Sequence, residues 1–218
     1  MNRLKITLCL CGLMFFAFKT FAQQVIKPPM TVNNLQAVNR TIKISTDEQR
    51  PAIVQVNAMP NSGVVWIKDL QFKTGIIEFD IKGKDAFQES FVGMAFHGIT
   101  DSLYEAVYFR PFNFQAEDAV RRKHAVQYIS LPQYDWPYLR ETFPDQYEAH
   151  LPAPVDPNDW FHVKIIVDDN TVRVFINKDQ NPVLIVQSLQ PGSAGKIGFW
   201  TGNGSDGEFA NLMITKEN

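Results

Sequence analysis

Cysteine is almost absent from this sequence: its 218 residues include only two, Cys9 and Cys11. Both lie in residues 1–22, which begin with basic residues, continue through the apolar run ITLCLCGLMFFAF and end at the small residue Ala22. This order is typical of a cleaved secretory signal peptide. We therefore expect cleavage after Ala22 and an exported protein, periplasmic or extracellular. Its mature chain then has no disulfide, no zinc thiolate and no cysteine nucleophile.

Two alternatives for this amino-terminal segment are open on the sequence. A retained membrane anchor is one, but the apolar run of about 13 residues is shorter than the roughly 20 that span a bilayer. A lipoprotein signal is the other, but the two cysteines lie within the apolar run rather than at its end. Export with cleavage is the interpretation that we adopt.

A basic surface is also missing. The whole chain has 21 lysines and arginines against 23 acidic residues, a net charge of −2. Removal of Arg3, Lys5 and Lys19 with the signal peptide leaves 18 basic residues against the same 23 acidic ones, a net charge of about −5. No basic run occurs, which argues against nucleic acid and, after signal cleavage, against a membrane as partners.

Signals for metals and cofactors are missing too. The four histidines, His97, His124, His150 and His162, do not have the spacing of metal ligands. The sequence contains no phosphate-binding loop and no Gly-x-Ser-x-Gly elbow. The segment GNGSDGE at residues 202–208 is rich in oxygen ligands for calcium, but a glycine-rich connection between strands is the simpler interpretation. We expect neither a metal nor a cofactor.

Long amphipathic helical stretches do not occur, and apolar residues instead alternate with polar ones from about residue 41 onward, as in β-strands. About a dozen strands in one domain are too many for an immunoglobulin-type sandwich. We therefore predict an all-β fold in residues 41–218, a two-sheet antiparallel β-sandwich of the jelly-roll type, after an amino-terminal arm at 23–40. The expected strands cover residues 41–45, 51–59, 62–72, 75–83, 90–98, 103–111, 124–130, 160–177 as a hairpin, 182–189, 195–202 and 207–215.

The strand GIIEFDIKG illustrates the alternation. It predicts that Ile77, Phe79 and Ile81 face the core, while the charged residues between them face water.

One segment, residues 131–159, breaks the alternation. It contains six prolines and four tyrosines or tryptophans. A loop of this length is usually functional or disordered, and its aromatic content argues against disorder. We expect an ordered excursion that packs over one end or face of the sandwich.

The sequence resembles bacterial domains with the concanavalin A-like lectin/glucanase fold in four segments: GVVWIKDLQFKTGIIEFDIKG, YEAVYFRPFNF, WFHVKIIVDDNTVRVFIN and GKIGFWTGNGSDGEFANLMI. Among these domains it is similar to the 3-keto-disaccharide hydrolase-like group, which is related to glycoside hydrolase family 16. The resemblance covers about residues 41–215. It implies a concanavalin A-like sandwich that binds a glycan in a groove on one sheet, with or without cleavage of O-glycosyl bonds. The alternatives are a non-catalytic carbohydrate-binding module and a structural or protein-interaction module.

The mechanism of glycoside hydrolase family 16 is excluded by the residues themselves. Those enzymes carry Glu-x-Asp-x-x-Glu on one strand, with the two glutamates as nucleophile and acid/base. Here EFDIKG supplies Glu78 and Asp80, but Lys82 and Gly83 occupy the positions where the second glutamate would lie.

The stretch YEAVYFRPFNF, residues 104–114, carries the strongest signal for a binding site. Alternation places Tyr104, Tyr108 and Arg110 on one face of a strand, and rings beside a planar guanidinium can stack on sugars and donate to hydroxyls. The alternative is that Arg110 is a structural clamp and the tyrosines pack beneath segment 131–159. The residues predicted to bind substrate are Tyr104, Tyr108, Arg110, Asn113, Gln127, Tyr128 and Trp136.

Glu105 lies on the opposite face of the same strand, among apolar neighbours. A carboxylate there is costly to bury unless it is paired, and Arg121, Arg122 or His124 could supply the partner. If it is catalytic, Glu105 would act as a general acid with His97 as the second titratable group. The alternative is a buried structural ion pair.

Overall fold

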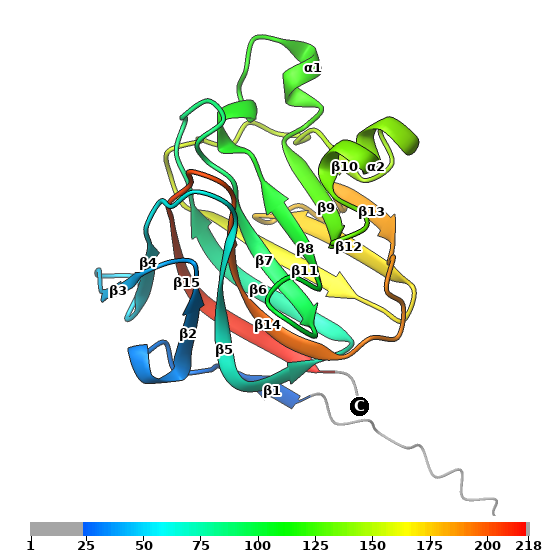
Figure 1. Cartoon of the computed structure of the whole chain (residues 1–218). Helices are drawn as coiled ribbons and strands as arrows, with labels where there is room; N and C mark the ends of the chain where they lie inside the picture. The colour runs from blue at the N-terminus through cyan, green and yellow to red at the C-terminus, as the bar shows by residue number, and fades with distance from the viewer. Residues whose placement is uncertain (1–23, 217–218) are drawn as a thin grey trace, which may run out of the picture.

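The computed structural model describes residues 24–216 and shows two β-sheets packed face to face (Figure 1). The expected signal peptide and its cleavage site lie outside the described residues. Within residues 24–216, no helix is long and apolar enough to cross a membrane.

One sheet has eight strands in the order β13-β12-β11-β6-β15-β4-β3, with β1 paired to β15. The other sheet has seven strands in the order β10-β9-β8-β7-β14-β5-β2. The eight-stranded sheet consists of β1 (Gln24–Ile26), β3 (Ile42–Ser45), β4 (Ile53–Val56), β6 (Gly75–Lys82), β11 (Phe161–Val167), β12 (Thr171–Ile176), β13 (Leu184–Gln187) and β15 (Gly207–Lys216). The seven-stranded sheet consists of β2 (Leu35–Val38), β5 (Gly63–Phe72), β7 (Val92–Gly98), β8 (Tyr104–Phe109), β9 (Val126–Leu131), β10 (Glu148–Ala149) and β14 (Gly195–Thr201).

All strand pairs in both sheets are antiparallel. The predicted two-sheet antiparallel β-sandwich is therefore confirmed. Within residues 24–216, four short helical elements lie outside the sheets: η1 (Val32–Asn34), η2 (Pro111–Asn113), α1 (Ala119–Arg122) and α2 (Trp136–Thr142).

The core lies between the inner faces of the two sheets. In β6, Ile77, Phe79 and Ile81 are fully buried and the residues between them are half-buried, as the alternation predicted. Phe209 of β15 stacks on Phe199 of β14 with ring centroids 4.6 Å apart. Such contacts between rings from the two sheets hold the apolar core together.

Strand β8 lies near the middle of the seven-stranded sheet and has different partners on its two faces. Phe109 points inward, with its ring centroid 5.2 Å from that of Phe161 in the opposite sheet. Tyr108 points to the outer face, where its ring lies 4.7 Å from Trp200. Gly93 pairs with Tyr108 across β7 and β8, and a Cβ there would lie 2.6 Å from the Tyr108 Cα. The close approach of the two backbones therefore requires glycine at position 93.

Segment 131–159 is ordered and contains α2 and β10, which lie beside β9 at one edge of the seven-stranded sheet (Figure 1). The amino-terminal residues 23–40, expected as an arm, contribute β1 and β2, which pair with β15 and β5. These additional elements have at most seven residues each. Elements this short do not produce a recognisable periodic pattern.

Candidate functional site

A row of polar side chains crosses three neighbouring strands on the outer face of the seven-stranded sheet. Tyr108 of β8 pairs with Gln127 of β9, and Gln127 pairs with Glu148 of β10. Residues that are directly paired in a sheet point to the same face. The row therefore places Glu148, which lies far along the chain, next to the stretch that the sequence singled out.

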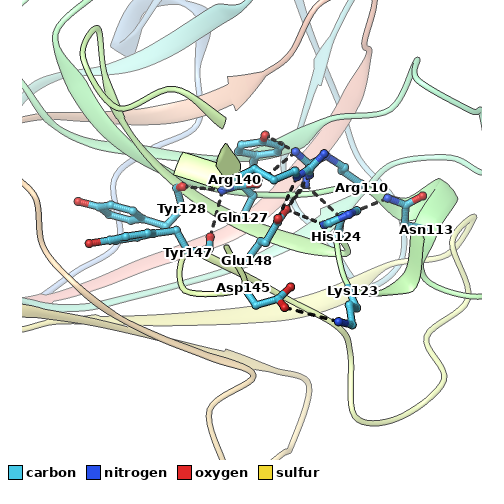
Figure 2. Close-up of polar contacts among 11 residues, drawn as sticks. Arg110, Asn113, Lys123, His124, Gln127, Tyr128, Arg140, Asp145, Tyr147 and Glu148 are labelled. Carbon is cyan, nitrogen blue, oxygen red and sulfur yellow. Dashed lines mark hydrogen bonds and ion pairs between the residues drawn. The ribbon is translucent and has the colours of Figure 1, made fainter. Parts of the chain in front are cut away.

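Glu148 is the centre of this row and is almost fully buried, with 3% of its side chain exposed. Arg140 donates to both of its oxygens, from Nε to Oε1 at 2.9 Å and from Nη2 to Oε2 at 2.6 Å. The Nδ1 atom of His124 lies 2.8 Å from Oε2, although it is not aligned for a hydrogen bond. Arg110 Nη1 lies 3.9 Å from the same oxygen. We call Glu148, Arg140, His124, Arg110 and Gln127 the Glu148 cluster (Figure 2).

Arg110 is fixed beneath the surface by several acceptors. Its Nη2 atom donates to the Tyr108 hydroxyl at 2.7 Å and to Gln127 Oε1 at 3.3 Å, and its Nη1 donates to the His124 carbonyl at 3.1 Å. Gln127 is held in turn, because its Nε2 donates to the carbonyls of Tyr128 and Tyr147 (Figure 2). The guanidinium plane is therefore set by neighbours on β8, on β9 and in the loop before β9, before any ligand arrives.

Helix α2 brings the exposed part of the site to this row. The Asp135 side chain accepts from the Tyr138 backbone N–H at 3.0 Å and caps the helix. Trp136 and Arg140 are four residues apart, so they lie on the same side of the helix. The Trp136 ring centroid is 4.9 Å from Arg140 Cζ and 5.9 Å from Arg110 Cζ.

Trp136 and Arg140 can both contact a ligand. Trp136 is 46% exposed, and Arg140 is partly exposed. Within residues 24–216, Arg140 Nη1 has no hydrogen-bond partner, whereas Nε and Nη2 are engaged by Glu148. The site therefore combines an open aromatic surface with a free N–H donor held in fixed orientation.

Burial controls the titration of the groups below this surface. It raises the pKa of Tyr108 and lowers the pKa of Arg110. It also lowers the pKa of His124, where the nearby Glu148 acts in the opposite direction and Arg140 adds to the lowering. Burial thus favours the neutral form of His124, and the cluster sets two guanidinium groups against one carboxylate.

The predicted binding residues separate into three groups. Tyr108, Arg110 and Gln127 belong to the row, Trp136 lies above it, and Asn113 touches it by donating to the His124 carbonyl at 3.2 Å. Tyr104 lies farther along the outer face, where its hydroxyl accepts from Trp200 Nε1 at 3.0 Å. Tyr128 points to the opposite, inner face, paired with Val107.

The rings on the outer face of the sheet itself, in the row and beyond it, are closed to solvent. Tyr104, Tyr108, Trp66 and Trp200 contact one another and are all buried. They therefore form the packed base of the outer face, and its exposed aromatic surface near the cluster is on α2.

Glu105 and His97 meet between the two sheets. Glu105 is fully buried and binds His97 Nδ1, the Tyr128 hydroxyl and the Ser188 hydroxyl, the last at 2.8 Å. His97 Nε2 donates to the Lys73 carbonyl at 2.7 Å, because a carbonyl can only accept. Burial and the Glu105 carboxylate raise the pKa of Tyr128 well above its usual value.

This arrangement matches the structural alternative for Glu105, with a different partner from those considered. The sequence suggested Arg121, Arg122 or His124 as the partner of Glu105, but these three residues make their contacts elsewhere. His97 is the residue that pairs with Glu105. The positive φ of His97, 53°, turns its side chain toward Glu105 near the end of β7.

Metal ligands do not gather anywhere in the described part of the chain. In segment 202–208, Asp206 pairs with Lys84 at 2.8 Å and Asn203 Oδ1 accepts from the Asn61 backbone N–H at 2.7 Å. Glu208 accepts from Gln55 at 3.0 Å. These contacts are those of a glycine-rich connection between strands.

A groove of about 480 Å³ lies on the outer face of the eight-stranded sheet, where Lys43, Gln55, Glu208 and Lys82 form a row across four strands. Its lining contains charged and amide groups but no aromatic ring. A sugar face would have nothing to stack on there, so we place the candidate site at the Glu148 cluster and α2.

The sequence did not predict that Arg140 and Glu148 belong to the site, because the contact between them depends on the path of segment 131–159. One signal was available. Asp135 followed by Pro137 is a helix start, with a capping side chain and a proline in the first turn. It would have placed Trp136 and Arg140 on one side of a short helix.

Comparison with known proteins supports the fold. No protein-family model matches the chain, and no curated protein sequence matches it. Among solved structures, the carbohydrate-binding module CBM66 from Bacillus subtilis is 14% identical, with 85% of this chain and 96% of that one covered and a TM-score of 0.56. The present chain therefore has the fold of a lectin-type β-sandwich. A Bacillus subtilis protein of unknown function with a galectin-like fold gives 16% identity, 90% and 98% coverage and a TM-score of 0.56.

This chain is also similar to the exoplasmic/lumenal domain of VIP36, in its form bound to calcium and Man3GlcNAc. It is 12% identical, 90% of each chain is covered, and the TM-score is 0.51. At these identities the likeness establishes the fold and leaves function to the site.

Proposed function

We propose that this protein is an exported carbohydrate-binding protein that holds a glycan at the α2 edge of the seven-stranded sheet. The observation that carries the proposal is the half-exposed Trp136 ring beside Arg140, whose guanidinium is fixed by Glu148 and keeps Nη1 free. An apolar sugar face can stack on the ring while a hydroxyl accepts from the guanidinium. The resemblance to the 3-keto-disaccharide hydrolase-like group and the carbohydrate-binding neighbours support a saccharide ligand.

The proposal is binding rather than cleavage. An acid of a glycosidase must reach the glycosidic oxygen, whereas Glu105 is fully buried between the sheets and already has three partners. Its side chain points away from the face that carries Trp136.

The direct test is a glycan-array screen followed by isothermal titration calorimetry on wild type and Trp136→Ala. We expect Trp136→Ala to weaken the selected saccharide more than tenfold, because a central aromatic contact carries much of such a binding energy. Ile185→Ala is the matched control, since Ile185 is an exposed apolar residue on β13 of the other sheet. Equal affinity of Trp136→Ala and wild type would place the glycan elsewhere, and no binding by wild type would refute the proposal.

Export is a separate part of the proposal and rests on the amino-terminal sequence pattern. Mass spectrometry of the protein recovered from the producing cells should give a mature chain that begins at Gln23. An intact Met1, or a lipid on Cys9 or Cys11, would contradict it.

A further inference from the structure

Two exposed aromatic rings in this protein have the same polar surroundings. Phe87, in the loop between β6 and β7, is 59% exposed, and Arg121 Cζ lies 4.6 Å from its ring centroid. Trp136 is 46% exposed and has Arg140 Cζ at 4.9 Å. Each ring therefore has a guanidinium group against it and much of its surface open to solvent.

The two guanidinium groups are also fixed in the same way. Arg121 donates from Nε to Asn113 Oδ1 at 3.2 Å and from Nη2 to the Phe112 carbonyl at 2.6 Å. Arg140 uses the same two nitrogens on Glu148. In both arginines, Nη1 has no hydrogen-bond partner among the residues that the structure describes. A ring with a pre-oriented free donor beside it thus occurs twice.

A continuous set of contacts joins the two rings. Asn113, which holds Arg121, donates to the His124 carbonyl, and this carbonyl also accepts from Arg110 (Figure 2). The His124 ring then reaches Glu148, the partner of Arg140. The helices that carry the two arginines, α1 and α2, lie toward the same end of the sandwich (Figure 1). A chain of polar contacts, largely buried, therefore connects the two ring-and-arginine units.

Phe87 is itself held in place from below. Its ring meets Phe112 edge to face at 5.7 Å, and Phe112 meets Phe91 in the same way at 5.3 Å. A large apolar side chain that is supported by neighbours yet open on one side is a pre-formed contact surface. Aromatic side chains contribute a large, rigid contact area at low cost in side-chain entropy.

We propose that Phe87 and Arg121 form a second subsite of the glycan site, so that the protein binds an extended oligosaccharide across both rings rather than a single terminal sugar. This inference rests on the proposed function. One sugar unit of the oligosaccharide stacks on Trp136 and accepts from Arg140. Another sugar unit, farther along the oligosaccharide, stacks on Phe87 and accepts from Arg121. Asn113, Arg110 and Glu148 lie buried between the two rings, so the intervening sugar units are held through the two rings and their free arginine donors.

The test measures how affinity depends on chain length. Gluco-, manno-, xylo- and arabino-oligosaccharides, each from the monosaccharide to the hexasaccharide, are titrated calorimetrically into wild type and Phe87→Ala. We expect wild-type affinity to rise with length for the series that binds. Phe87→Ala should bind the shortest ligands as wild type does and lose roughly 3- to 10-fold for the hexasaccharide.

Three further variants make the result specific. Phe87→Tyr keeps a ring and should keep the length dependence, whereas Trp136→Ala should weaken every length. Ile99→Ala removes an exposed apolar residue in the β7–β8 turn, outside both subsites, and should bind as wild type does.

The outcomes separate the two proposals. If the hexasaccharide binds Phe87→Ala and wild type equally while Trp136→Ala loses binding, the second subsite is refuted and the proposed function stands. If wild type binds no member of any series, the proposed function fails and the extended site fails with it.

Discussion

Arg110 and Arg140 approach the same carboxylate from different depths, so replacement by lysine should act differently at the two positions. Arg110 is buried and its two terminal nitrogens donate to three acceptors. Lysine cannot reproduce the planar fork, so Arg110→Lys leaves buried acceptors such as Gln127 Oε1 unpaired. We expect a loss of about 1–3 kcal/mol in the free energy of unfolding, measured by urea denaturation.

Arg140→Lys is the matched comparison at the exposed end of the cluster. It should reduce saccharide affinity and cost less in the free energy of unfolding than Arg110→Lys, because Arg140 is partly open to solvent and a lysine there keeps a positive charge beside Glu148. A stable Arg110→Lys protein with lost binding would show instead that Arg110 contacts the glycan directly.

Glu105 accepts hydrogen bonds from the hydroxyls of Tyr128 and Ser188 and pairs with His97 Nδ1. Glu105→Gln keeps the shape but turns one oxygen into an NH2 group that faces a donor. We expect a loss of about 1–3 kcal/mol or more in unfolding free energy, with saccharide affinity unchanged. Ser188→Ala removes only one donor and should cost less.

The same Glu105 variant tests the catalytic alternative. Hydrolysis of a bound glycan by wild type that disappears in Glu105→Gln, with folding and binding intact, would make Glu105 a catalytic acid. Loss of stability without any change in turnover would fit the buried contacts with His97 and Tyr128.

At the scale of elements, α2 is short but positions both exposed groups of the site. Asp135→Ala removes the acceptor of the Tyr138 N–H and should cost about 0.5–2 kcal/mol in helix stability. The effect should be local: faster hydrogen exchange of the α2 amides and weaker saccharide binding, with a small change in global stability. Asp118 caps α1 in the same manner, so Asp118→Ala is the control, and short saccharides should bind it normally. Unchanged binding by Asp135→Ala would mean that packing alone holds α2.

The strands also differ in how well the sequence predicts their faces and their pairing. Alternation fixes which residues share a face, so Tyr108 and Arg110 were correctly separated from Glu105 on one strand. It also made Gln127 a candidate from the neighbouring strand. Glu148 lies in β10, a strand of only two residues, and pairs with Gln127 of β9. No local sequence pattern predicts such a long-range pairing. The strands were therefore predictable, whereas the centre of the polar cluster was not.

At the scale of the whole molecule, stability comes from the apolar layer between two sheets, and the site is built on the face that this layer does not use. Phe79 lies in β6, between β11 and β15, and is fully buried. Phe79→Ala should cost about 3–5 kcal/mol, because the lost ring leaves a cavity that neighbouring strands cannot close. Urea unfolding followed by far-ultraviolet circular dichroism measures this loss as a shift of one cooperative transition.

Lys82→Ala is the control from the same strand, since Lys82 is on the outer face and should change stability by no more than about 0.5 kcal/mol. Because Phe79 belongs to the eight-stranded sheet and Trp136 to the edge of the other, Phe79→Ala protein that is still folded should bind saccharide with wild-type affinity. A stability loss below about 1 kcal/mol would contradict the assigned faces of β6. Lost affinity in the folded variant would instead mean that the core layer sets the geometry of the site, and that binding and stability cannot be changed independently.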